Sequence, residues 1–191
     1  MNTQEQLERL QALWWEPESL RFYRPSLKDT SGTALSLDLR LTPEFGASYV
    51  GKVSGGLFVE LVPQLTVKTA QKDATFGWED PQKVTAKFGL PDISALLVAI
   101  RCRYARRLVP EGLRSKGDTI GNTVGMFHRF VEDGVSATTV IEYAMVGDEA
   151  FLKMSRSATQ RRTIKLSMAE ELQLECYLKH ALHAFTLVGK R

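Results

Sequence analysis

Lysine and arginine side chains are concentrated in two segments of this chain. Residues 150–169 include five bases and no acid, and residues 101–116 include six bases against one glutamate. The whole chain of 191 residues has a formal charge of only +3, so the remainder is acidic. Guanidinium and ammonium groups bind phosphates, and a protein that separates charge in this way usually presents a basic surface to a polyanion. We therefore predict a nucleic-acid-binding surface. The alternative is a solvated, ion-paired face without a ligand.

The spacing of these bases indicates which of them reach a ligand. In the run RRTIKL, Arg161 and Lys165 share one face of a predicted strand, while Ile164 and Leu166 share the other. The same alternation directs Lys83 and Lys87 outward from the predicted strand that ends at Phe88. Point charges along strands bind phosphates without reading bases, so we expect little sequence preference and a steep salt dependence. The predicted phosphate ligands are Lys83, Lys87, Arg103, Arg106, Arg107, Arg114, Lys116, Arg156, Arg161 and Lys165.

One aromatic side chain is the best candidate for stacking on an unpaired base. Leu57, Val59 and Leu61 occupy one face of their predicted strand and leave Phe58 on the other. Stacking on such a ring contributes roughly 1–3 kcal/mol per base in single-strand binders. Most of the other aromatic residues on predicted strands are expected in the core. They are Phe22, Tyr23, Phe127 and Tyr143.

Sequence motifs for catalysis are absent. The chain contains no G-x-x-x-x-G-K-S/T loop, no signature of an activated nucleophile and no evident acid–base pair of carboxylates. We therefore predict a protein that is not an enzyme and uses no cofactor. Cys176, His180 and His183 fall at i, i+4 and i+7 on one helix face, a spacing that zinc accepts, but no fourth ligand lies nearby. A metal-dependent enzyme is kept as one alternative, and an assembly adaptor whose charges only solubilise it as another.

Length and composition bound the class of protein. Hydrophobic residues make up 43% of the chain and charged residues 25%, which is typical of one globular domain with a real core. The longest apolar run, residues 95–100, is far shorter than the roughly 18 residues of a membrane span, so no membrane partner is expected. No secretory signal opens the chain. Cys102 and Cys176 do not suggest a disulfide framework and fit a reducing compartment.

The first half of the chain predicts strands followed by a helix. Residues 3–15 have leucines at helical spacing, and we assign residues 1–19 to a helical lead-in. Pro43 is expected to end the second strand. Asp92 is expected to cap a helix that ends near Cys102 or Tyr104. The strands predicted in this half cover residues 20–27, 35–41, 57–62 and 82–88.

The second half repeats this order. Ser167 and Glu170 form a capping box at the start of a long final helix, and Gly189 is expected to end it. Two such halves favour antiparallel sheets covered by helices, an α+β fold, in a single domain over residues 20–191. The strands predicted here cover residues 124–132, 138–146, 151–157 and 162–166.

The chain resembles the Whirly-fold family in the order of its elements and in three sequence segments. The run GTALSLDLRLTPEF, residues 32–45, is similar to the G-K-A-A-L … P-E-F segment of the plant Whirly proteins. The helix entry FGLPDISALLVAI and the ending TIKLSMAEELQLECYLKHALHAF occupy the positions of that family's two helices. The basic second half looks closest to the kinetoplastid mitochondrial guide-RNA-binding proteins, which share the fold. The family's lysine is Thr33 here, and the box residues that match are Gly32, Ala34, Pro43, Glu44 and Phe45.

The resemblance implies a fold, an assembly and a function. The fold would be two antiparallel four-stranded sheets packed crosswise, with two main helices that build a tetramer of identical or paralogous subunits. The function would be that of a mitochondrial matchmaker. It holds guide RNA by its phosphates and promotes pairing with pre-mRNA during uridine insertion and deletion editing. A Whirly-type single-stranded-DNA binder in organelle genome maintenance or transcription is the alternative.

Overall fold

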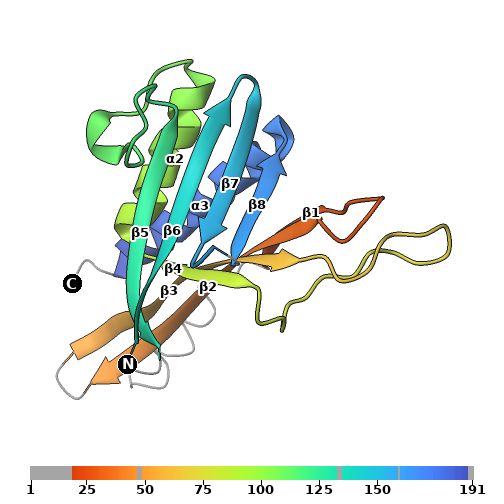
Figure 1. Ribbon diagram of the computed structural model, residues 1–191. Helices are drawn as coiled ribbons and strands as arrows, with labels where there is room; N and C mark the ends of the chain where they lie inside the picture. Colours follow the sequence, from red (N-terminus) through yellow and green to blue (C-terminus); the bar gives the residue numbers. More distant parts are fainter. Residues whose placement is uncertain (1–18, 47–48, 133–134, 159, 189–191) are drawn as a thin grey trace.

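The computed structural model describes residues 19–46, 49–132, 135–158 and 160–188 (Figure 1). The predicted helical lead-in over residues 1–19 lies almost wholly outside the described residues. Eight strands, two α-helices and one short 3₁₀ helix make up the described part of the chain.

The first sheet has the strand order β1-β2-β3-β4, and every neighbouring pair is antiparallel. Its inner face is apolar because leucines alternate with polar residues: Leu35, Leu37 and Leu39 are buried on β2 and pair with Leu61, Val59 and Leu57 of β3. The strands are β1 (Leu20–Arg24), β2 (Thr33–Gly46), β3 (Tyr49–Pro63) and β4 (Val84–Phe88).

The second sheet repeats this architecture with the order β5-β6-β7-β8. Its inner face carries Tyr143, Leu152 and Ile164, which lie side by side on neighbouring strands and are almost completely buried. The strands are β5 (Thr123–Glu132), β6 (Val135–Val146), β7 (Glu149–Ser155) and β8 (Arg161–Leu166).

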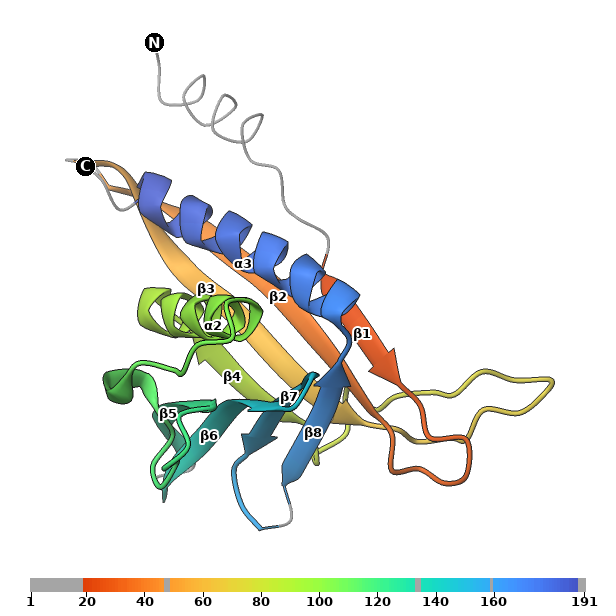
Figure 2. The ribbon, with the colours of Figure 1, turned by 90° about the horizontal axis from the view of Figure 1, so that it is seen from above.

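Two helices fill the angle between the sheets. The helix α2 (Leu90–Tyr104) contacts β4, β5 and β6, and α3 (Met168–Val188) contacts strands of both sheets. Figure 2 shows the helices lying over the first sheet, behind the second. A single apolar cluster joins the inner faces of both sheets to both helices. The strands of the two sheets run across one another in Figure 1. The predicted α+β fold with two antiparallel four-stranded sheets is confirmed.

Two local predictions were wrong. Pro43 does not end its strand: β2 continues to Gly46, with Pro43 opposite Val53. Beyond Leu37, β2 has no β1 neighbour, so Pro43 lies on an edge of the sheet, where proline is tolerated. Asp92 is not the N-cap of α2, which is Gly89. The Asp92 carboxylate, which lies at the third helical position, instead accepts a hydrogen bond from the Gly89 N–H (2.8 Å).

The connection between β3 and β4, residues 64–83, covers part of the outer face of the first sheet. Tyr23 of β1 contacts the rings of Phe76 and Trp78, and the Arg21 guanidinium lies 4.9 Å from the Trp78 ring centroid. This part of the outer face is therefore closed to a ligand. Among the described helices, none has the length and apolar character needed to cross a membrane.

Candidate nucleic-acid interface

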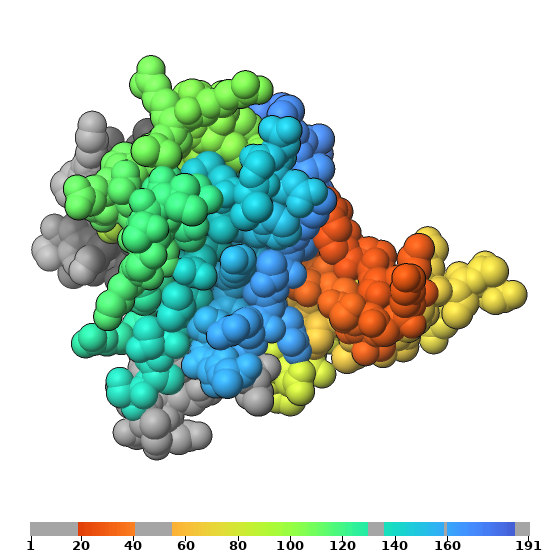
Figure 3. Space-filling view, turned by 45° about the horizontal axis from the view of Figure 1, so that its top comes forward, coloured from red at the N-terminus to blue at the C-terminus, as the bar shows by residue number. Residues whose placement is uncertain are grey.

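The outer face of the second sheet gathers cationic side chains from three strands. Alternation places Arg129 of β5, Lys153 of β7, and Arg161 and Lys165 of β8 on the side away from the helices. Arg129, Arg161 and Lys165 are exposed and Lys153 is half-buried. We call the outward residues of β5–β8 the second-sheet face. It points toward the viewer in Figure 1 and forms a continuous surface in Figure 3.

Acidic side chains neutralise only part of this face. Lys165 forms an ion pair with Glu149. Glu142 lies on the same face and accepts a hydrogen bond from the Ser115 hydroxyl. Arg129, Lys153 and Arg161 have no side-chain hydrogen bond or ion pair with any described residue. Three cations thus remain available to an anionic ligand.

Two aromatic rings share the face with these cations. Phe127 of β5 is 55% exposed, and Phe151 of β7 is half-buried beside Lys165. The expectation that most of the other rings lie in the core was wrong: Phe22 and Tyr143 are buried, but Phe127 and Tyr23, which is 43% exposed, are not. Phe127 points outward because Met126 and His128 occupy the inner face of β5.

Phe58 lies on the outer face of the first sheet, opposite Leu57 and Val59 as predicted. Its ring is already in contact with two cations. The Arg40 guanidinium lies 4.8 Å and the Lys87 ammonium 6.0 Å from its centroid. A base can stack on Phe58 only by displacing them, so Phe127 is the more accessible ring.

Arg103 does not present its charge to the surface. Its side chain is only 8% exposed and forms an ion pair with the fully buried Glu171, which also accepts a hydrogen bond from the Tyr143 hydroxyl. Burial raises the pKa of Glu171 even though Tyr143 and Arg103 oppose the shift. Burial, followed by the hydrogen bond to Glu171, raises the pKa of Tyr143. Arg103 belongs to this internal cluster, and we remove it from the candidate phosphate ligands.

Three further predicted ligands donate hydrogen bonds inward. The Lys83 ammonium donates to the Trp78 carbonyl (2.8 Å), and its pair with Glu60 is 3.7 Å long. The Arg114 Nε donates to the Val109 carbonyl (2.9 Å). Each of these side chains holds a connection in place.

Arg156 is the third. Its guanidinium donates to the Thr85 carbonyl (3.1 Å) and reaches the Thr139 hydroxyl (3.4 Å), so it joins the second sheet to β4. Its side chain therefore has a structural role where the two sheets meet.

Arg106, Arg107 and Lys116 are exposed, as the sequence predicted. They lie on the segment between α2 and β5, which contains the 3₁₀ helix η1 (Glu111–Leu113). This segment packs along β5, where Arg114 pairs with Val124, and it flanks the second-sheet face in Figure 3. Lys87, Arg106, Arg107, Lys116, Arg161 and Lys165 are therefore the predicted ligands that reach the surface.

The sequence reasoning missed Arg129 and Lys153 as site residues. A signal for Lys153 was present, because Leu152 and Met154 are both apolar and direct the residue between them outward. Arg129 lies within a run where apolar and polar residues do not alternate cleanly, so its orientation follows only from the pairing of β5 with β6.

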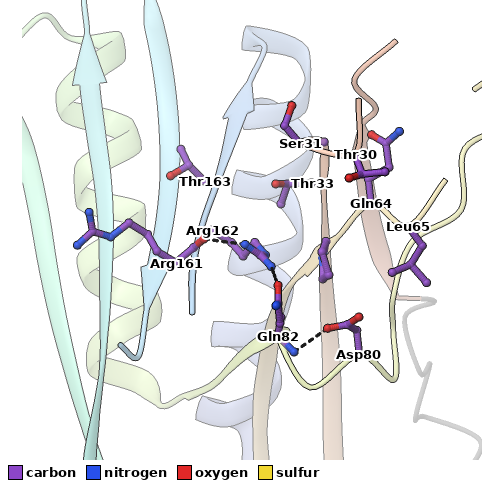
Figure 4. Close-up of a pocket in the computed structure, with 12 residues that line it drawn as sticks. Thr30, Ser31, Thr33, Gln64, Leu65, Asp80, Gln82, Arg161, Arg162 and Thr163 are labelled. Carbon is purple, nitrogen blue, oxygen red and sulfur yellow. Dashed lines mark hydrogen bonds between the residues drawn. The ribbon is translucent and has the colours of Figure 1, made fainter. Parts of the chain in front are cut away.

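A polar groove of about 480 Å³ adjoins the face where β8 begins. Figure 4 shows Arg162 pointing toward Gln82, whose side-chain oxygen accepts its hydrogen bond (2.7 Å), while Arg161 extends away from the groove. Because Arg162 is occupied and the Asp80 carboxylate lines the same groove, we do not assign a phosphate there.

The final helix buries Leu174, Leu178 and Ala181 against the rest of the chain. Its start follows the prediction: the Ser167 N–H donates to the Glu170 carboxylate (2.8 Å). Cys176 and His183 are exposed and His180 is half-buried. Within the described part of the chain, no group of three or more histidine, cysteine, aspartate or glutamate side chains is arranged to hold a metal ion.

No protein-family model matches the chain, and no curated protein matches it.

Proposed function

We propose that this protein is a non-enzymatic RNA-binding and annealing factor that holds a single RNA strand on the second-sheet face. The observation that carries the proposal is the set of cations without an ion-pair partner in the described part of the chain, beside the exposed ring of Phe127. These cations are Arg129, Lys153 and Arg161. Strand spacing gives the face a width of about 14 Å between β5 and β8.

The chemistry of this face favours binding without sequence readout. Ammonium and guanidinium groups neutralise phosphates whatever the base, and aromatic rings stack on any base. A strand held by its phosphates keeps its Watson–Crick edges free for a second strand. Neutralised phosphates also repel an approaching strand less, which accelerates pairing.

The more specific parts of the proposal come from the resemblance to the Whirly-fold guide-RNA-binding proteins. They are the mitochondrial location, the pairing of guide RNA with pre-mRNA in uridine insertion and deletion editing, and the tetramer, with identical or paralogous subunits. Single-stranded DNA is the second candidate ligand, because the cations and rings on the face suit either backbone.

Binding should depend steeply on salt. For single strands, the logarithm of affinity changes with the logarithm of salt by about −0.7 for each neutralised phosphate. We therefore expect that Arg129→Ala with Arg161→Ala weakens binding of unrelated RNAs alike and makes this slope shallower by about 1.4. Fluorescence anisotropy across a salt series measures both quantities.

The control removes the same charge elsewhere. Lys68 and Lys72 lie on the 64–83 connection, which projects away from the second-sheet face in Figure 1. Lys68→Ala with Lys72→Ala should leave the slope unchanged. A flat salt dependence of the wild type, or equal losses in both double variants, would contradict a phosphate-binding role for this face.

Two further measurements address the ligand and the activity. Competition between RNA and DNA of equal sequence decides between the two candidates. An annealing assay with complementary RNAs should show a rate that rises with the protein and falls in the Arg129→Ala, Arg161→Ala variant. Binding without faster annealing would remove the matchmaker function and leave a single-strand binder.

A further inference from the structure

A second groove, of about 730 Å³, lies at the end of α2, apart from the groove at β8. Its walls come from the end of α2, from the hairpin between β6 and β7 and from the start of α3. In Figure 1 the end of α2 and this hairpin both lie at the top of the molecule. The volume is within the range of small-ligand sites. Its lining includes Tyr104, Arg106, Arg107, Asn122, Asp148 and Met168.

Arg106 occupies a backbone position that usually belongs to glycine. The Arg107 N–H donates to the Cys102 carbonyl (2.8 Å) and the Arg106 N–H to the Arg103 carbonyl (3.0 Å), the two bonds that close a helix end. Arg106, which donates one of these two bonds, has a left-handed backbone conformation with a φ of 50°. Any side chain is strained there, and glycine would end the helix equally well. The arginine therefore points to a use of its side chain beyond the helix end.

Stabilising the helix dipole is the competing explanation for these arginines. The last turn of α2 already contains Arg101 and Arg103, which provide that charge. Arg106 and Arg107 lie beyond this turn and are exposed. Neither side chain forms an ion pair or hydrogen bond with a described residue. Both charges are thus available to an anion in the groove.

The rest of the groove offers a platform and a hydrogen-bond acceptor. The Tyr104 ring is 40% exposed and is therefore accessible for stacking on a base, and burial raises the pKa of its hydroxyl. The exposed Asp148 carboxylate lines the same groove. Carboxylates of this kind accept hydrogen bonds from ribose hydroxyls.

The hairpin that presents Asp148 is fixed to α2. The Arg103 guanidinium donates to the Asp148 backbone carbonyl while it pairs with the buried Glu171. The backbone at Asp148 is therefore held at a defined distance from the end of α2. Such fixed spacing reduces the entropy lost when a ligand binds.

We propose that this groove binds the 3′-terminal nucleotide of an RNA strand. Arg106 and Arg107 bind its phosphate, Tyr104 stacks on its base, and Asp148 accepts hydrogen bonds from the vicinal hydroxyls that only a free 3′ end possesses. This inference rests on the proposed function. On the second-sheet face, Phe151 of β7 lies about three residues, or roughly 10 Å, along the strand from Asp148 in the hairpin. One RNA strand can therefore occupy both sites.

Linear and circular RNAs of one unstructured sequence test the proposal, because only the linear form has ends. The wild type should bind the linear RNA about tenfold more tightly in fluorescence anisotropy, consistent with one additional stacked base. A linear RNA with a 3′-terminal phosphate, which lacks the free diol, should lose most of that preference. The double variant Arg106→Gly with Arg107→Ala should bind both forms equally.

Two controls keep the outcomes distinct. Glycine suits the left-handed position, so the double variant should melt no lower than the wild type, which separates lost binding from lost folding. Lys68→Ala with Lys72→Ala removes equal charge outside the groove and should retain the preference for ends.

Equal binding of linear and circular RNA by the wild type would overturn the 3′-end site but leave RNA binding by the second-sheet face intact. Absence of binding to either form would remove the proposed function itself. If the double variant instead lowers the mass of the assembly and keeps the preference for ends, the groove is a subunit contact and the end site is wrong.

Discussion

Arg103 and Arg106 are three positions apart and have opposite roles. The Arg103 side chain is buried against Glu171, whereas the Arg106 side chain is exposed and has no hydrogen-bond or ion-pair partner among the described residues. A buried ion pair is weak evidence for net stability, but removing one partner leaves a charge without compensation. The environment of each arginine therefore decides whether its loss affects folding or binding.

We expect Arg103→Ala or Glu171→Ala to lower the free energy of unfolding by about 3–5 kcal/mol, because each leaves a buried charge unpaired. Replacing both residues together with Met and Leu should recover most of that loss. Urea titrations of the single and double variants measure the coupling. Arg101→Ala is the matched control: the Arg101 side chain is 65% exposed and its pair with Glu175 spans 3.7 Å, so a change below about 1 kcal/mol is expected. A stable Arg103→Ala protein with weakened RNA binding would restore Arg103 as a phosphate ligand.

The two helices begin at carboxylates that accept backbone hydrogen bonds. The Asp92 carboxylate accepts a hydrogen bond from the Gly89 N–H at the start of α2. The Glu170 carboxylate accepts one from the Ser167 N–H at the start of α3 and also pairs with Arg24 of β1. The start of the last helix is thereby attached to the first sheet. Burial alone would raise the pKa of Glu170, but the hydrogen bonds from Ser167 and Arg24 outweigh it and leave this pKa below its ordinary value of 4.5.

Glu170→Gln should therefore lower stability at pH 7 by about 1 kcal/mol and have little effect near pH 3. A lowered carboxyl pKa contributes stability above the unfolded pKa, and that contribution is lost as pH falls through the folded value. The raised pKa of Glu171 makes stability change with pH in the opposite direction. Because Glu171 is present in both proteins, its contribution cancels when they are compared. Urea midpoints at the two pH values provide the measurement. A difference that persists undiminished at pH 3 would show that the charge of Glu170 is not the cause.

At the scale of the whole molecule, the turn between β7 and β8 joins the two sheets. Arg156 donates to the Thr85 carbonyl of β4, and the Gln160 side chain donates to the Pro81 carbonyl (2.9 Å). These bonds hold the second sheet across the first and leave its outer face open. Arg161 follows this turn directly and points to that face.

Arg156→Ala and Arg161→Ala should therefore have separate effects. Loss of the Arg156 hydrogen bonds should lower the free energy of unfolding by about 1–3 kcal/mol and leave the RNA affinity of the folded protein unchanged. Arg161→Ala should weaken RNA binding and change stability by less than about 0.5 kcal/mol. Thermal unfolding and anisotropy on the same two proteins test this. Equal effects of both variants on affinity would mean that the binding surface extends across the junction of the sheets.

Local patterns in the sequence determined much of the architecture. Alternation placed Ile164 and Leu166 inside and Arg161 and Lys165 outside, and the Ser167 capping box marked the start of the last helix. These features depend on residues a few positions apart, so the period of a strand or a helix end encodes them directly. The order of elements followed from the same periods, whereas the arrangement in two four-stranded sheets was what the resemblance to the Whirly fold implied.

The tertiary structure alone decided which cations are available to a ligand. Arg103 meets Glu171 across 68 positions of sequence, and Arg156 meets Thr85 across 71, so no local spacing reveals that these side chains are occupied. The grouping of Arg129 with Lys153 and Arg161 likewise required the register of the four paired strands. Charge is a property of the residue, but its availability depends on the neighbours that folding brings to it, and those neighbours come from distant parts of the chain.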